Sequence, residues 1–158
     1  MRKGSRQMFI RLLAIVLTAL ALVPGGAHLF ALSNKIDLPR DQYFTVQSIY
    51  FGWALLGIVL FAALAANLIL AISVQRHRTA FMLAVAGFVG IAATLLIFFL
   101  WTYPANVATS NWTVAPADWR ELRTQWEYSH AANAVITFLA LVCVTLAGLL
   151  SAPESVKH

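Results

Sequence analysis

The residues best able to do chemistry in this 158-residue chain lie between positions 101 and 137. Glu127 and His130 are three positions apart there, so on a helix a carboxylate and an imidazole project from one face, one turn apart. Further polar residues fall within the same arc of roughly 100°: Arg120, Arg123 and Thr137, with Asn133 beside it. An imidazole oriented by a carboxylate can remove a proton from a substrate. His130, Glu127 and Arg123 are therefore the predicted catalytic residues.

The Glu-x-x-His spacing also occurs in di-metal helical bundles, but such sites need a second copy and two further carboxylates, which this sequence lacks at membrane depth. A single metal ion could be held by His28, Glu127 and His130, two imidazoles and one carboxylate. Haem ligation by His28 and His130 is another possibility, as is a site without any cofactor. In the simplest alternative, Glu127 pairs with Arg123 or Arg120, and His130 hydrogen-bonds a loop.

The composition places these residues in a membrane protein. The chain is 61% hydrophobic and 11% charged, whereas a soluble domain is about 25% charged. A helix needs about 20 apolar residues to cross the hydrocarbon core, and four stretches are long enough. The predicted spans are residues 8–31, 46–73, 79–101 and 130–151. We expect an all-α, antiparallel four-helix bundle that forms one transmembrane domain over residues 1–158.

The distribution of basic residues predicts how the bundle is inserted. The N-terminus, the connection at Arg76 and Arg78 and the C-terminal tail carry most of the 11 Lys and Arg residues, whereas the other two loops mix basic and acidic residues. Because Lys and Arg are retained on the cytoplasmic side, both termini are predicted to be cytoplasmic. The net charge of +5 then reflects topology and contact with anionic lipid, and no nucleic-acid partner is expected.

The predicted helices differ in how well they position the candidate residues. Pro24, Gly25 and Gly26 are expected to interrupt the first span, with His28 just beyond the break at the outer boundary. In an alternative reading, this N-terminal span is a cleaved signal peptide. The second span is expected to be one long helix, with an early face that carries Tyr43, Gln47, Tyr50 and Trp53. Aromatic residues at such a boundary are commonly interfacial anchors.

The last span is expected to extend beyond the membrane. After Trp101 the chain should turn at Pro104 and continue as an irregular loop. Pro116 and Asp118 resemble the first turn of a helix, and no helix breaker follows. A helical extension over residues 116–129 is therefore predicted to run without a break into the fourth span and to carry the polar stripe into the membrane.

A longer pattern from Pro116 to His130, P-x-D-W-x-x-L-R-x-x-W-E-x-x-H, resembles the anthrone oxygenase-like family of small four-span membrane proteins. The resemblance implies functional positions at Asn106, Trp119, Leu122, Arg123, Trp126, Glu127 and His130. It also implies a multi-pass protein of the bacterial inner membrane. Many members carry an Arg shortly after the His, where this chain has Ala131, Ala132 and Asn133.

Two classes of function follow. In the first, the protein is an oxygenase-like or redox enzyme, and a hydrophobic aromatic substrate binds among Tyr50, Trp101, Asn106 and Trp126, beside His130. In the second, it is a non-catalytic protein that binds lipid or quinone, or an accessory subunit of a larger membrane complex. Membrane lipids are partners in both.

The three candidate metal ligands are also predicted to share one place in the bundle. His28, Glu127 and His130 should converge, within about 10 Å of one another, at the outer end of a pocket lined by Tyr50 and Trp126.

Overall fold

A computed structural model describes residues 3–152, and every regular element in this part of the chain is a helix. Arg2, Glu154 and Lys157, which enter the charge argument, lie outside the described residues. Four helices are long and apolar enough to cross a membrane: Gly4–Lys35, Trp53–Val74, Arg78–Ala108 and Trp119–Leu150. This confirms two parts of the prediction: the described chain is all-helical, and it has four helices long and apolar enough to span a membrane.

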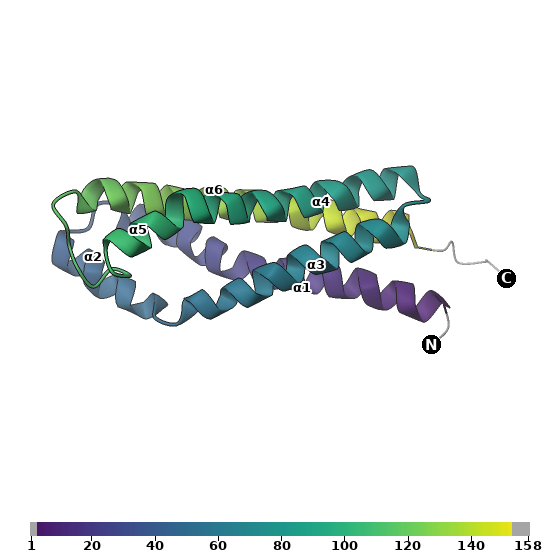
Figure 1. The fold of residues 1–158 in the computed structure, drawn as a ribbon, viewed down its shortest axis with the longest axis horizontal. Coiled ribbons are helices and arrows are strands. Elements are labelled where there is room, and N and C mark those ends of the chain that lie inside the picture. The colour runs from purple at the N-terminus through teal and green to yellow at the C-terminus, as the bar shows by residue number, and fades with distance from the viewer. Residues whose placement is uncertain (1–2, 153–158) are drawn as a thin grey trace.

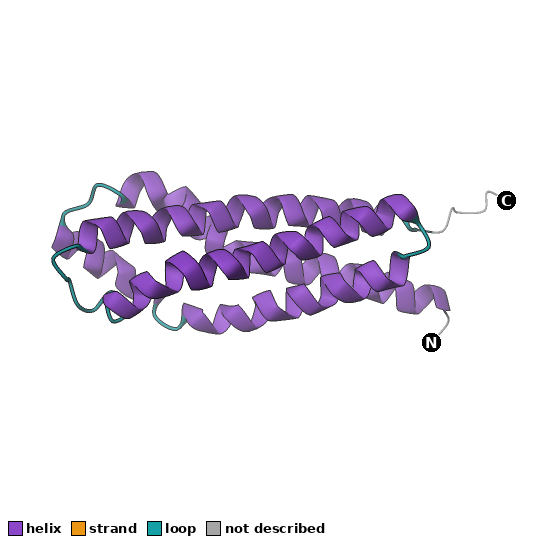
Figure 2. Ribbon diagram, turned by 45° about the horizontal axis from the view of Figure 1, so that its top comes forward, coloured by secondary structure: helices purple, strands orange, loops and turns teal. Residues whose placement is uncertain are grey.

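The four long helices form a ring, in which each helix packs against two others. Helices α1 (Lys3–Lys35) and α4 (Arg78–Ile97) each contact both α3 (Gly57–Val74) and α6 (Trp119–Leu150). The start of α1, the short α3–α4 connection and the end of α6 lie together at one end of the bundle (Figures 1 and 2). The short helices α2 (Arg40–Gln47) and α5 (Tyr103–Ala108) lie at the other end, here called the α2–α5 end.

Small residues bring the backbones of the long helices close together. A Cβ added at Gly87 of α4 would lie 2.5 Å from Val144 Cγ2 of α6, and one at Gly90 would lie 3.1 Å from Ala140 Cβ. In lipid, where water exclusion cannot hold helices together, such close packing is a main source of association. The α4–α6 contact therefore fixes the position of α6, which carries the polar stripe.

Helix α1 is not interrupted at Pro24, Gly25 and Gly26, so the predicted break is wrong, and the helix continues to Lys35, past the predicted end of the span at residue 31. Pro24 removes one backbone donor, a loss that a helix inside a membrane bundle tolerates. A Cβ at Gly25 would lie 3.3 Å from Ala134 Cα, so glycine lets α1 approach α6 closely. His28 and Lys35 are seven residues apart in the sequence. Because α1 stays helical to Lys35, this spacing puts both side chains on the same face of the helix.

The second span is shorter than predicted, because the chain before it is broken at Gly52. Helix α2 ends at Gln47, two 3-10 helices cover Ser48–Tyr50 and Trp53–Leu56, and α3 begins at Gly57. Between the 3-10 helices Gly52 adopts φ 83°, a left-handed conformation that glycine accepts at little cost. This turn lets α2 fold over the end of the bundle.

Around Pro104 the chain stays helical and does not turn as predicted. A π-helical segment, Phe98–Thr102, joins α4 to α5, and the Tyr103 N–H bonds to the Phe98 carbonyl. Pro104 has no backbone N–H, and the wider π-helical turn before it accommodates the missing hydrogen bond. The third span therefore extends to Ala108, well past its predicted end at Trp101.

The helical extension of the last span begins later than predicted, at Trp119 and not at Pro116. Asp118 has φ −92° and ψ 20°, which is outside the helical range, and Pro116 contributes only a turn, in which its carbonyl accepts from the Trp119 N–H. From Trp119 the helix runs without a break to Leu150. The continuous stripe through Arg123, Glu127 and His130 therefore forms on α6.

Candidate functional site

Two histidines from different helices stack at the α2–α5 end of the bundle. The ring centroids of His28 on α1 and His130 on α6 are 4.2 Å apart, and the ring planes are inclined by 31°. His28 is buried, with 3% of its surface exposed, whereas His130 is partly exposed. The packing of α1 against α6 thus puts a partly exposed histidine against a buried one.

Lys35 joins His28 to Glu127. Its Nζ lies 2.9 Å from Glu127 Oε1 and 3.3 Å from His28 Nδ1. Glu127 has no exposed surface and Lys35 has 3%. The structure therefore brings His28, Glu127 and His130 together, as predicted, and Lys35 links Glu127 to His28. The chemical roles of the three residues stay a prediction.

The expected pairing of Glu127 with Arg123 or Arg120 is not formed. The Arg123 Nη1 donates to the Leu38 carbonyl at 2.8 Å, and its guanidinium lies over the Trp119 ring at 4.8 Å. Arg123 thereby holds the connection between α1 and α2 against α6. Arg123 therefore supports the backbone next to the site and does not pair with Glu127. The ion pair of Glu127 is formed with Lys35.

Helix α2 contributes a second donor to Glu127. The Tyr43 hydroxyl donates to Glu127 Oε1 at 2.9 Å and accepts from Gln47 Nε2 at 2.7 Å. Burial, together with the nearby Glu127 carboxylate, raises the pKa of Tyr43 well above its usual range, so this hydroxyl stays protonated and remains a donor. Glu127 Oε2 and Gln47 Oε1 are buried without a hydrogen-bond partner among the described residues.

Aromatic rings surround the histidine pair. The centroids of Tyr50 and Trp126 lie 4.2 Å and 4.7 Å from that of His28, and Trp126 lies 4.3 Å from His130. Trp53 is 6.0 Å from His28. The Lys35 Nζ lies 4.8 Å from the Tyr50 centroid and 5.4 Å from that of Trp126, within the range of cation–π attraction. The site is thus a buried ion pair and two imidazoles enclosed by aromatic faces.

Asn106, implied by the family resemblance, acts on this cluster through Trp126. Its Oδ1 accepts from the Trp126 Nε1 at 2.7 Å, which fixes the indole against both histidines. Trp119 and Leu122 belong to the adjoining cluster of apolar side chains around Tyr43. These three positions support the site and do not line it.

The metal site predicted from His28, Glu127 and His130 does not fit the structure. Among residues 3–152, no three His, Cys, Asp or Glu side chains are arranged to hold a metal ion. The Lys35 ammonium lies against both Glu127 and His28, where it already provides the positive charge that a metal would bring. These residues form an ion pair with a lysine and not a metal centre.

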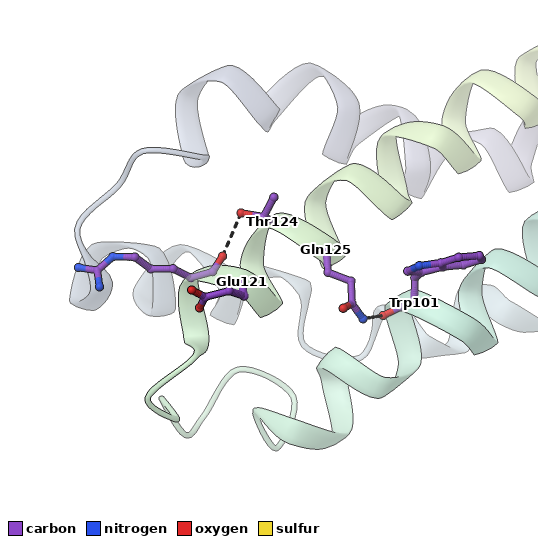
Figure 3. A pocket seen from close by; sticks show the side chains of 5 residues that line it. Trp101, Glu121, Thr124 and Gln125 are labelled. Carbon is purple, nitrogen blue, oxygen red and sulfur yellow. Dashed lines mark hydrogen bonds between the residues drawn. The ribbon is translucent and has the colours of Figure 1, made fainter.

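Trp101 lies apart from the histidine cluster, in a hollow of about 550 Å³ on the outside of α6. Figure 3 shows its backbone oxygen accepting from Gln125 Nε2 at 2.8 Å. The hollow is open and is lined by Trp101, Arg120, Glu121, Thr124 and Gln125. A second hollow shares Trp101. Neither is lined by Tyr50 or Trp126, so Trp101 does not join the predicted substrate-binding set, and the hollows do not coincide with the predicted pocket.

Sequence reasoning missed Lys35, and it took Tyr43 and Gln47 for an interfacial face. Lys35 follows His28 by seven residues, a spacing that puts both side chains on one helical face. This indicates a contact only if the first helix continues through Pro24 to Lys35. The spacing of four residues between Tyr43 and Gln47 is helical, but nothing local points to Glu127 as their partner.

No family model, curated protein or solved structure matches the chain. The resemblance to the anthrone oxygenase-like family stays a prediction, based on Asn106, on the motif from Pro116 to His130 and on the length and four spans of the chain.

Proposed function

We propose that the protein is a multi-pass membrane enzyme of the oxygenase type, similar in function to the anthrone oxygenase-like family, that acts on a hydrophobic aromatic substrate. The observation that carries this proposal is the His28–His130 pair beside the buried Lys35–Glu127 ion pair. Charged groups buried inside a membrane protein are costly and are commonly functional. A role in packing alone would not require two imidazoles and an ion pair to face one another.

The two histidines have different roles in this proposal. His28 Nδ1 lies within hydrogen-bond distance of the Lys35 ammonium, which can only donate. His28 is therefore assigned as neutral, with its hydrogen on Nε2. His130 is partly exposed and contacts the rings of His28 and Trp126. His130 is the base that a lipid-dissolved substrate would meet, while Lys35 holds His28 in place.

The proposed reaction needs a substrate with an acidic C–H conjugated to a carbonyl or phenol oxygen. His130 removes the proton, and the electron pair of the C–H bond delocalises onto that oxygen. The anion then forms a C–O bond to O₂, which is reduced to the peroxide level and takes the proton back from His130 to give a hydroperoxide. Loss of water, which also uses the second hydrogen of the same carbon, leaves a new carbonyl group, so that one substrate and one O₂ yield one quinone and one water.

The function is tested by incubating the purified protein in detergent with anthrone and measuring oxygen uptake and anthraquinone formation. We expect both to exceed the spontaneous rate and to be in a ratio of one to one. A wild-type protein that leaves the spontaneous rate unchanged would contradict the proposal and favour the alternative, a lipid-binding or quinone-binding protein or an accessory subunit.

In this proposal, the enzyme is an antiparallel bundle with both termini in the cytoplasm, so that the site at the α2–α5 end lies at the outer boundary of the bacterial inner membrane. Arg6, Arg11, Arg76 and Arg78 belong to the end of the bundle opposite the site, which supports this orientation through the retention of basic residues inside. Arg11 also donates to the Ser151 carbonyl at the end of α6.

This topology predicts the labelling of single cysteines in intact cells. In a Cys143→Ala background, Ala108→Cys, at the exposed end of α5, should react with a membrane-impermeant maleimide. Arg76→Cys, in the exposed α3–α4 connection, should react only after the cells are lysed. The reverse pattern would move the site to the cytoplasmic side.

A further inference from the structure

We propose that Lys35 binds the oxygen of the substrate anion that forms when His130 removes the proton. The inference rests on the proposed function and adds the group that holds this oxygen. It assigns a binding role to a residue outside the motif that resembles the oxygenase family.

The hydrogen-bonding capacity of Lys35 is not filled. An ammonium group has three N–H donors, and the described side chains supply two acceptors, Glu127 Oε1 and His28 Nδ1. Its remaining near neighbours are the faces of Tyr50 and Trp126, at 4.8 Å and 5.4 Å. A ring face attracts a cation more weakly than an oxyanion does. One donor is therefore available to a substrate oxygen.

The other buried cation cannot take this role. Arg123 donates to the Leu38 carbonyl, and its guanidinium lies over the rings of Tyr43 and Trp119, at 5.4 Å and 4.8 Å from their centroids. Lys35, in contrast, contacts His28 directly. Of the described cations, it is the one that faces the histidine pair.

Lys35 and His130 are placed to act on two ends of one flat molecule. His28 contacts both of them, and both lie near the Trp126 ring. An aromatic substrate packed against these rings would present its oxygen to Lys35 and its C–H to His130. His130, Tyr50 and Trp53 are each partly exposed. Such a molecule would reach the site from lipid past these three residues.

The Lys35–Glu127 pair suits an anion that appears only during the reaction. Before proton removal, Glu127 balances the ammonium, and the Tyr43 hydroxyl donates to the same Oε1. When the C–H proton leaves, the new negative charge arises beside a cation that is already in place. Charge that develops in a dry site is stabilised strongly by such fixed groups.

The test compares two variants that differ only at Lys35 and leave no unpaired buried carboxylate: Glu127→Gln and Lys35→Met/Glu127→Gln. The binding probe is 2-naphthol, whose anion has its own absorption band, with 2-naphthyl methyl ether as the control that cannot ionise. We expect bound naphthol to ionise at a pH lower by about one unit or more when Lys35 is present. Anthrone turnover should be about 100-fold lower without Lys35.

Different results would overturn the two proposals. If bound naphthol ionises at the same pH in both variants, Lys35 is not the oxyanion site, whether or not anthrone is oxidised. If the naphthol shift depends on Lys35 but the wild-type protein does not oxidise anthrone, the oxyanion site stands and the oxygenase function fails. His130→Ala should keep the naphthol shift and lose turnover; loss of the shift in this variant would contradict the separate roles of His130 and Lys35.

Discussion

The Lys35→Met variant is expected to be destabilised by about 3–5 kcal/mol, because it leaves the Glu127 carboxylate buried without its counter-charge. Glu127 has no exposed surface, and its Oε2 already lacks a hydrogen-bond partner among the described residues. With Lys35 removed, Tyr43 remains as the donor to Oε1. The unfolding free energy can be measured by titration with SDS in mixed micelles.

Two further variants make this measurement specific. Lys35→Met/Glu127→Gln removes both charges and should recover most of the lost stability. Arg40→Met breaks the Arg40–Asp41 pair, whose N–O distance is also 2.9 Å but whose side chains are 58% and 85% exposed, and should change the stability by less than about 1 kcal/mol. Equal stability of Lys35→Met and the wild type would show that the Lys35–Glu127 pair does not carry charge.

The His130→Ala variant is expected to lose anthrone oxidation by a factor of about 100 to 10,000, the range for removal of a general base. The loss should appear in kcat, because the ring that removes the proton is gone while Tyr50, Trp126 and Lys35 still form the site. Oxygen uptake and anthraquinone absorbance measure the rate. Added imidazole should restore part of it by entering the space left by the ring.

Phe99→Ala is the matched control for His130→Ala. Phe99 is an aromatic side chain on the π-helical segment, 53% exposed, away from the histidine pair, and its removal should leave kcat within about twofold of the wild type. His130→Ala with the wild-type kcat would exclude His130 as the base and leave the site without an accessible one.

The family resemblance and the structure draw attention to different residues of one cluster. The motif on α6 contains Arg123, Glu127 and His130, but it says nothing of their partners. In the structure, Arg123 fastens the backbone at Leu38, whereas Lys35 of α1 and Tyr43 of α2 bind Glu127. A carboxylate in a membrane helix needs a counter-charge, and only the packing of α1 against α6 shows which one it has.

The sequence by itself determined that the chain has four apolar spans and that α6 carries a polar stripe through Glu127 and His130. Both properties are local: the length of an apolar run decides whether a helix can cross a membrane, and helical periodicity decides which side chains share a face. The long uncharged stretches and the absence of a breaker after Trp119 were therefore sufficient.

Only the tertiary structure decided where the helices are broken and which residues pair. Helix α1 continues through Pro24 and Gly25, where Gly25 packs against Ala134 of α6, whereas Gly52 interrupts the chain before α3 by adopting a positive φ. The Tyr43–Glu127 hydrogen bond joins residues 84 positions apart. Such contacts depend on the free energy of packing several helices at once, and no pattern within one helix contains that information.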